Sequence, residues 1–555
     1  MSMDILGSAL SGLAASQRAL ETTSNNISNV STEGYSRQRV ELATRSEQYT
    51  GSGYVGNGVD AVNIVRSYDQ FITEQLRSST SAFAGADTYQ KLITQVDNLI
   101  ANESTGLSPA IKSFFNAIND VSNDPSSVPA RQVILAEADT MAKQFNNLAS
   151  RFNEMGKQVN SQLDSIVGDL NNFAKALAKL NNNIVSDMGR SAGKQIPNES
   201  LDQRDWLLSN IAQKVDVSVI NQTDGSVSIF IGQGQPLVLG SYAANLSVQA
   251  SKTDSAHKSI LLNGQDISPQ ITSGELYGNL HFRDLVLDVA QQQLGSLAMG
   301  IAIEFNSVHQ SGFDLNGNPG LALFDLGSPS IGVKSVAKDS NLIVTASFSA
   351  PPSAANIGAS YRLDVSATVP DVTYNLTNLS DGTSINGLNN ASLPTATVAA
   401  GFSITFPSGV LNAGDSFKIS PGIDAARTLR TNAAITSPRQ VAAADMPGLS
   451  GDNRNALKLA KIETQSIMQN GKVTFTQVYG QLVADVGSKT HSAQLNRDAQ
   501  QTLFQRAKGA QESVSGVNLD EEAADLIKYQ HSYQAAAHVV SIAKNLFDTL
   551  IQAIR

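Results

Sequence analysis

The chain has 555 residues, with 39 Lys and Arg against 49 Asp and Glu, and no cysteine. Its length predicts about three or four domains, and the missing cysteine excludes disulfides, thiolate metal sites and a cysteine nucleophile. The acidic balance argues against a nucleic-acid or anionic-membrane partner, because no basic block is present to neutralise phosphates.

The N-terminal segment predicts an amphipathic helix. It opens with an acidic stretch, Met1 to Asp4, and the chain has no run of about 18 apolar residues, so we expect neither a Sec-type signal nor a membrane span. Apolar residues recur at every seventh position, the spacing of a coiled-coil seam. They are Leu6, Leu13, Leu20 and Ile27. Turn-forming residues around Asn29 should end this helix.

Three further helical stretches are expected. Residues 68–121 predict a helix pair interrupted near Gly106 to Pro109, and residues 131–184 predict one rod of roughly 80 Å at about 1.5 Å per residue. Its apolar residues keep the seven-residue step. They are Ala138, Phe145, Phe152, Val159, Ile166, Phe173 and Leu180. Residues 453–517 predict C-terminal helices that can pack on these N-terminal ones.

Between these helices the apolar period changes to two, which is typical of strands. Val215 to Val219, Val227 to Ile231 and Leu237 to Leu239 predict short strands, with Asp224-Gly225 as a hairpin turn. Residues 326–424 predict a second strand-rich region, rich in Ser, Thr, Asn and Gly. Residues 285–310 predict a helix that returns to the helical body before this second region.

The C-terminal segment repeats the seam. Asn518 can cap a helix whose first turn is acidic. Its seam residues are Leu519, Leu526, Tyr533, Val540, Phe547 and Ile554, with Leu550 in the second position of the last heptad. The two seams bury too little apolar surface to offset the backbone entropy of ordering both ends. We therefore expect both ends to be disordered in the monomer and to fold when other copies surround them.

These elements predict an α+β multidomain protein, with a long α-helical coiled-coil body formed by the N- and C-terminal segments and β-rich domains inserted centrally. The expected units are a terminal coiled-coil domain (1–40 with 515–555), a helical body (41–212 with 285–325 and 425–514), a β-rich domain (213–284) and a variable outer β-rich insertion (326–424).

No pattern in the sequence indicates catalysis. The six histidines include no HExxH motif and no pair four residues apart. Gly487 to Thr490 only mimics the end of a P-loop, since it lacks the upstream glycine and a preceding strand. We therefore expect no enzyme activity, no cofactor, and no catalytic or metal-binding residues.

Two polar clusters require separate interpretations. Asp314 to Gly320 places oxygens as in a calcium loop, with Asp325 at the twelfth position, but Pro319 stands where that loop needs glycine. An Asn/Gly turn is therefore favoured over a calcium site, which stays open. Asp202, Arg204 and Asp205 have a helical spacing that suits ion pairs.

The terminal residues resemble a known family. Gly12 to Leu20, Thr22 to Val30 and Glu33 to Gln38 are similar to the N-terminal signature of bacterial flagellar axial proteins. Within that family, further stretches resemble the subunits of the first junction ring between hook and filament. They are Leu201 to Asp205, Phe305 with His309 to Gly320, Gly414 to Phe417, Gly451 to Leu457 and Ser515 to Ala524.

This resemblance implies a structural subunit that leaves the cell unfolded through the flagellar type III export channel. It implies four partners: copies of the chain in a helical ring, hook protein below, the second junction protein above, and an export chaperone on the C-terminal helix. The expected assembly interface is the two seams, Leu6, Leu13, Leu20, Ile27, Leu519, Leu526, Tyr533, Val540, Phe547 and Ile554. The expected chaperone-binding residues are Leu526, Tyr533, Val540, Phe547 and Leu550.

Two alternatives stay open. The chain could be another flagellar axial subunit, either the second junction protein or a flagellin, since these share coiled ends. It could also be a secreted coiled-coil adhesin or effector with a β head, although seams at both extreme termini are unusual for a stalk.

Overall fold

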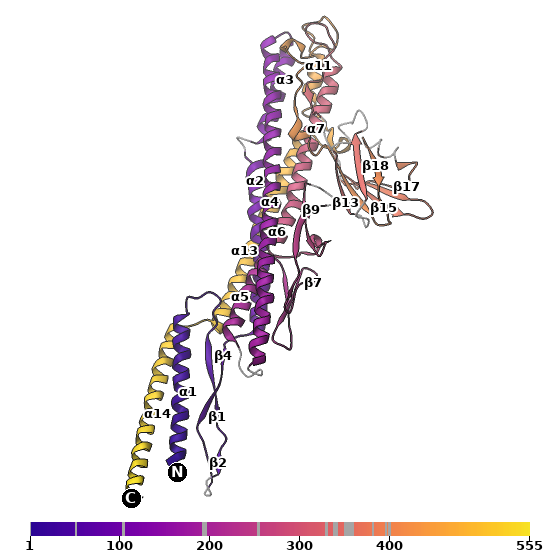
Figure 1. Cartoon of the computed structure of the whole chain (residues 1–555). Helices are drawn as coiled ribbons and strands as arrows, with labels where there is room; N and C mark the ends of the chain where they lie inside the picture. Colours follow the sequence, from indigo (N-terminus) through magenta and orange to yellow (C-terminus); the bar gives the residue numbers. More distant parts are fainter. Residues whose placement is uncertain are drawn as a thin grey trace.

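A computed structural model describes residues 2–49, 53–102, 106–190, 197–251, 256–327, 331–336, 342–348, 360–379, 382–393, 397 and 401–554. The molecule is an elongated rod of helices, with both chain ends at one end of the rod and a β-sheet domain projecting from its side (Figure 1). The predicted fold class, α+β with helical ends and central β-rich parts, is confirmed.

The rod is built around α4 (Val128–Arg190), a helix of 63 residues. It packs on α3 (Leu107–Asn123), and α13 (Phe475–Ser515) packs on α2 (Gln70–Ile100), so that N- and C-terminal helices share one core. The break near Gly106 separates α2 from α3, as predicted. Most residues of the seven-residue apolar repeat predicted for 131–184 are fully buried on α4, because this spacing keeps them on one face of the helix. They include Ala138, Phe145, Phe152 and Val159.

The first β-rich part lies along the lower half of α4. After α5 (Asn198–Lys214) come two antiparallel sheets. One contains β5 (Val217–Asn221), β6 (Val227–Ile231), β7 (Gln235–Leu239) and β8 (Tyr242–Ala243), and the other β9 (Leu246–Ala250), β10 (Lys258–Leu262) and β11 (Gln265–Asp266). The predicted β5–β6 turn is confirmed, with Gly225 at a φ of 90° that favours glycine.

Asparagines on α4 attach this part to the rod. The Asn181 amide donates to the carbonyl oxygens of Val227 and Gly240 at 2.8 and 2.7 Å, and its oxygen accepts the Val227 N–H at 3.2 Å. Asn171 makes the same two-way contact with Leu246. Strand ends that would otherwise leave polar groups unpaired are thus satisfied by the helix.

The chain then returns to the rod and leaves it again. A 3-10 turn (Ser268–Gln270) precedes α6 (Gly274–Phe282), a π-helical turn (Arg283–Leu287) and α7 (Asp288–Gln310), which together match the predicted returning helix. Shorter elements complete the rod. They are α10 (Ala425–Thr428), a 3-10 turn (Pro438–Gln440), α11 (Arg454–Lys461) and α12 (Met468–Gly471), with β12 (Phe324–Asp325) paired to β20 (Arg430–Thr431).

The outer β domain has its own core. One sheet has the order β13 (Ile331–Val336), β19 (Ser416–Pro421), β15 (Tyr361–Ala367), β16 (Thr373–Asn378) and β17 (Ser384–Asn389). A second pair joins β14 (Ile343–Phe348) to β18 (Phe402–Ser408). Aromatic residues fill the space between them, including Tyr361, Phe402 and Phe417.

The terminal unit contains α1 (Ser2–Ser28), α14 (Leu519–Ile554) and a hairpin that the sequence did not predict. Its strands are β1 (Gln38–Thr44) and β4 (Val59–Arg66), with β2 (Gln48–Tyr49) and β3 (Tyr54–Val55) toward the tip. α1 contacts α14 on one side and the hairpin on the other (Figure 1). The strands lack a clear apolar alternation because nearly all of their side chains are exposed or only half-buried.

Candidate functional site: the terminal helix pair and its polar joint

The buried face of α1 consists of small side chains. Within one chain, the residues that α14 and the hairpin cover are Ala9, Ser11, Ala15, Ala19, Thr22, Thr23 and Asn26. Gly58 of the hairpin lies against Ser8 and Ser11 so closely that a Cβ there would collide with the Ser11 hydroxyl. The pairing of α1 within its own chain therefore uses little of its large apolar surface.

The predicted seam residues are only partly brought together. Five of them are half-buried on helices that contact each other: Leu13, Leu20, Ile27, Leu526 and Val540. Leu6, Leu519, Tyr533 and Phe547 are exposed. The side chains of Leu550 and Ile554 lie outside the described part of the chain.

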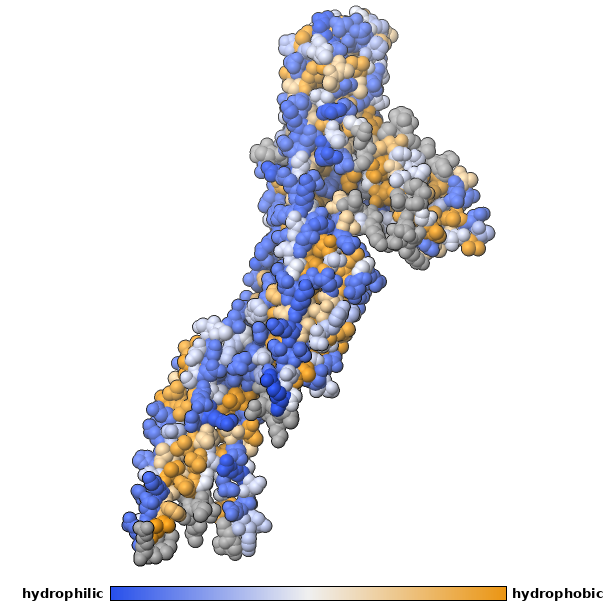
Figure 2. All heavy atoms as spheres, viewed as in Figure 1, coloured by the Kyte–Doolittle hydropathy of each residue, from blue (hydrophilic) through white to orange (hydrophobic). Residues whose placement is uncertain are grey.

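Several uncovered apolar residues were missed by the seam analysis. Leu10 on α1 is 58% exposed, and Ile542 and Leu546 on α14 are 58% and 56% exposed. Val539, Ile542 and Leu546 follow one another at steps of three and four residues. This spacing marks a second stripe on α14, a signal that a search for one seam overlooks. Figure 2 shows apolar side chains gathered along the terminal helices at the lower end of the molecule.

A polar joint holds the terminal unit together and connects it to the rod. Arg37, which follows α1, forms ion pairs of 2.7 Å with both Glu521 and Glu522 at the start of α14. Glu522 is buried and also accepts a hydrogen bond from the Asn26 amide at 2.9 Å. The Asn518 side chain caps α14 by accepting from the Asp520 N–H, so the capping prediction is confirmed.

The second half of the joint lies on α5. Asp202 accepts the Ser36 N–H at 3.0 Å and pairs with Arg66 at 3.0 Å, while Asp205 pairs with Arg66 at 2.6 Å. Burial and the nearby Asp202 carboxylate raise the pKa of Tyr35 to about 12. Ion pairs were predicted for this cluster, but the cations come from β4 and α2. Arg204 instead donates to the Gly225 carbonyl oxygen.

The Asp314 cluster is a turn in this structure. One Asp314 oxygen accepts the N–H groups of both Asn316 and Asn318 at 2.8 Å. Asp325 pairs with Arg430 at 2.6 Å. The favoured interpretation of a polar turn therefore agrees with the geometry. No helix in the described ranges is long and apolar enough to cross a bilayer.

Comparison with known families agrees with this architecture. Residues 6–35 match the family model of flagella basal body rod protein, and residues 509–553 match flagellar basal body rod FlgEFG protein C-terminal. Residues 93–324 match the flagellar hook-associated protein FlgK helical domain. The paired termini and the helical rod thus define the class of protein, which is a structural subunit of the axial part of the bacterial flagellum.

Whole-chain relatives narrow this class. The chain is 33% identical to flagellar hook-associated protein 1 of Salmonella typhimurium, over 99% of each chain. It is 31% identical to that of Escherichia coli K12, again over 99% of each. A solved structure of the flagellar hook junction protein FlgK from Burkholderia pseudomallei shares the fold, with a TM-score of 0.68 at 23% identity over 80% of this chain and 100% of the other.

The chain therefore belongs to the flagellar hook-associated protein 1 family. The prediction of a structural subunit of the hook–filament junction is confirmed, and the adhesin, second junction protein and flagellin alternatives are not favoured. The family is one of structural proteins that assemble into the flagellum with other flagellar proteins.

Proposed function

We propose that copies of this chain form a helical ring at the hook–filament junction through head-to-tail contacts between their terminal helices. Hook protein lies below this ring and the second junction protein lies above it. The chain reaches the site through the flagellar type III export channel and acts outside the cell. The β domains face outward from the ring.

The observation that carries this proposal is the uncovered apolar surface of the terminal pair. Small residues fill the contact inside one chain, while Leu10, Ile542 and Leu546 remain more than half exposed. Complete burial of such side chains contributes roughly 1.5–3 kcal/mol each. Contiguous exposed apolar residues of this kind mark an interaction surface, and neighbouring copies can cover it.

The same helix serves a chaperone before export. An amphipathic helix binds a groove through one apolar stripe, here Leu526, Tyr533, Val540, Phe547 and Leu550. Leu526 and Val540 are half-covered in the folded chain. Chaperone binding and pairing with α1 therefore exclude each other, which would keep the C-terminal segment from assembling early.

The proposed units follow the expected division, with one change. The β1–β4 hairpin contacts α1, so we propose that the terminal unit extends from residue 2 to about Ser67 and from 515 to 555. The helical body therefore begins at about residue 68 instead of 41, while its other limits, the 213–284 domain and the outer 326–424 insertion stay as predicted.

Deletion of the gene tests this function. We expect cells that do not swim, bare hooks, and filament protein shed into the medium, with all three reversed by the full-length chain on a plasmid. Normal filaments in the deletion strain would contradict the proposal. If a chain lacking residues 515–555 complements the deletion, only the proposed role of the terminal pair is contradicted.

A further inference from the structure

The outer β domain presents a row of cations to the rod. Across its sheet, Lys334 on β13 lies directly opposite Lys418 on β19, and Lys418 lies directly opposite Arg362 on β15. Residues that oppose each other on neighbouring strands project from the same face, where like charges destabilise the sheet. A row of three cations therefore requires counter-charges.

Two of these cations have counter-charges. Lys334 Nζ lies 3.2 Å from carboxylate oxygens of both Asp284 and Asp288, at the start of α7. Arg362 pairs with Asp364 at 2.8 Å on its own strand. No carboxylate of the described residues forms an ion pair with Lys418 within 4.0 Å. Burial lowers the pKa of its ammonium group, and the Asp288 and Asp284 carboxylates, which are already paired with Lys334, oppose this only from a longer distance. A partly buried ammonium without a counter-ion is costly.

The wall opposite Lys418 carries unsatisfied polar groups. Ser296 on α7 is 2% exposed, and its hydroxyl has no hydrogen-bond partner among the described residues. The same holds for the Gln293 side-chain oxygen, and the amide can turn to present its NH₂ group instead. Lys418, Ser296 and Gln293 line one hollow of about 260 Å³ between α7 and the outer sheet. Such a volume admits a small polar ligand.

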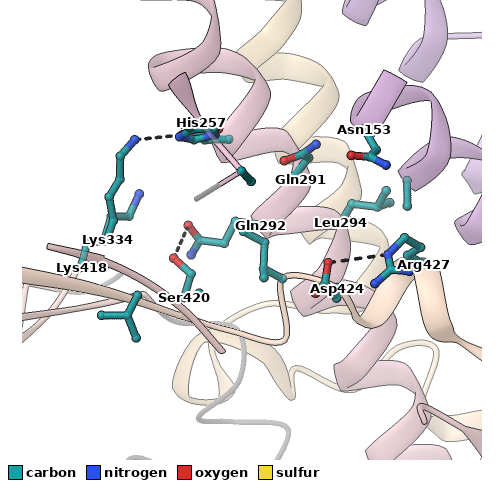
Figure 3. Close-up of a pocket in the computed structure, with 16 residues that line it drawn as sticks. Asn153, His257, Gln291, Gln292, Leu294, Lys334, Lys418, Ser420, Asp424 and Arg427 are labelled. Carbon is teal, nitrogen blue, oxygen red and sulfur yellow. Dashed lines mark hydrogen bonds and ion pairs between the residues drawn. The ribbon is translucent and has the colours of Figure 1, made fainter. Parts of the chain in front are cut away.

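Lys418 also lines a larger hollow of about 510 Å³. There Lys334 and Lys418 lie side by side below His257, and Ser420 donates to Gln292 (Figure 3). Asp288 and Asp424 also line it, so their carboxylates repel an anion. The smaller hollow has no Asp or Glu among its described lining residues. Electrostatics therefore favours the smaller hollow for a negatively charged ligand.

We propose that a small oxyanion, a phosphate or a carboxylate, binds between Lys418 of the outer domain and Ser296 and Gln293 of α7. Its oxygens accept hydrogen bonds from the ammonium, the hydroxyl and the turned amide. The ligand neutralises the unpaired cation in the row. It also ties the outer β domain to the rod, because both sides contribute donors.

Thermal unfolding of the full chain tests this site with inorganic phosphate as the probe and chloride at equal ionic strength as the reference. We expect a saturable rise in the midpoint of about 2–4 °C. Lys418→Gln should abolish the rise and Ser296→Ala should weaken the apparent Kd about fivefold. Arg362→Gln, a matched removal of a cation from the same row, should leave the rise unchanged. Acetate in place of phosphate distinguishes the ligands, since a response to acetate assigns a carboxylate.

Hydrogen exchange localises the effect. In the wild type and in Arg362→Gln, phosphate or acetate should slow exchange in the peptides that cover residues 289–300 and 416–421. In Lys418→Gln, exchange in both peptides should stay unchanged. The proposal is overturned if neither anion raises the midpoint, or if Lys418→Gln responds as the wild type does. All three substitutions shorten or remove polar side chains without adding bulk, so a folded protein is expected in every arm.

Discussion

At the scale of single residues, buried polar side chains decide how the parts of the rod are held together. His309 is fully buried, with its Nε2 accepting the Ala442 N–H at 2.9 Å and its Nδ1 donating to the Leu321 carbonyl oxygen at 2.5 Å. Arg131 donates in the same region to the carbonyl oxygens of Val441 and Pro125. These side chains pair backbone groups that have no secondary-structure partner.

The neutral state of His309 predicts a pH dependence of stability. Burial lowers its pKa from 6.5 to about 4, so between these values only the unfolded chain binds the proton. The free energy of unfolding should therefore fall as the pH drops from 6.5 to 4, by about 3 kcal/mol in total. Urea unfolding at pH 7, 5.5 and 4 measures this. In His309→Gln, which cannot titrate, the fall should be smaller by that amount; equal pH profiles would contradict the assignment.

Asn181 predicts a large effect of one amide. Its side chain makes three hydrogen bonds to backbone groups of the 213–284 domain while fully buried. Asn181→Ala leaves these groups unsatisfied and should lower the free energy of unfolding by about 2–4 kcal/mol. Asn182→Ala, its exposed neighbour, should change it by less than about 0.5 kcal/mol. Urea unfolding with hydrogen exchange over 217–231 would show the difference, and equal losses would count against the role of Asn181.

At the scale of elements, the terminal helices differ from the rod in which of their faces are covered. Most of the residues in the seven-residue repeat of α4 are buried within the same chain, whereas the terminal pair keeps large apolar residues outside. The joint through Arg37 and Glu522 connects α1 to α14 across nearly the whole chain. Both ends must therefore be present for this element pair to form.

Phe547 tests the exposed surface of α14. It is 45% exposed, so Phe547→Asp should leave the isolated chain folded but abolish incorporation, because the new charge is buried only in the assembly. Asn545→Asp adds the same charge about 200° around the helix and should retain motility. Swimming assays and far-UV circular dichroism of both variants measure this. Normal swimming with Phe547→Asp would argue against the proposed interface.

At the scale of the whole molecule, we predict that order at the chain ends is coupled to assembly. The single tryptophan of the chain, Trp206, lies at the joint. It contacts Phe173 on α4, and Gly34, at a φ of 82°, lies against its side chain. Its environment therefore depends on whether the terminal unit is docked on the rod.

Trp206 fluorescence tests the prediction that the ends are disordered in the monomer. If they are disordered, deletion of residues 1–36 should leave the emission maximum of the monomer unchanged, because Gly34 does not cover the indole. If the ends are already docked, the deletion should expose the indole and shift its emission to longer wavelength. The same comparison with Phe173→Leu, which alters the rod side of the contact, verifies that the indole reports on this region.

The sequence by itself determined which segments are helices. The seven-residue steps of Ala138, Phe145 and Phe152, or of Leu526 and Val540, are local patterns, and local periodicity is sufficient to place a helix and its apolar face. The same holds for the Asp224-Gly225 turn and the order of helical and β-rich parts. The resemblance of the terminal signatures to a flagellar family also required no coordinates.

Only the tertiary structure decided which apolar faces remain open and which charges meet. Arg37 and Glu522 are 485 residues apart in the chain, and Lys418 meets α7 because of strand register. The exposed strands of the 38–66 hairpin carry no clear apolar period, so packing on α1 was required to define them. Burial and charge pairing are properties of surfaces from distant segments, and a local pattern contains no information about which distant surface will cover it.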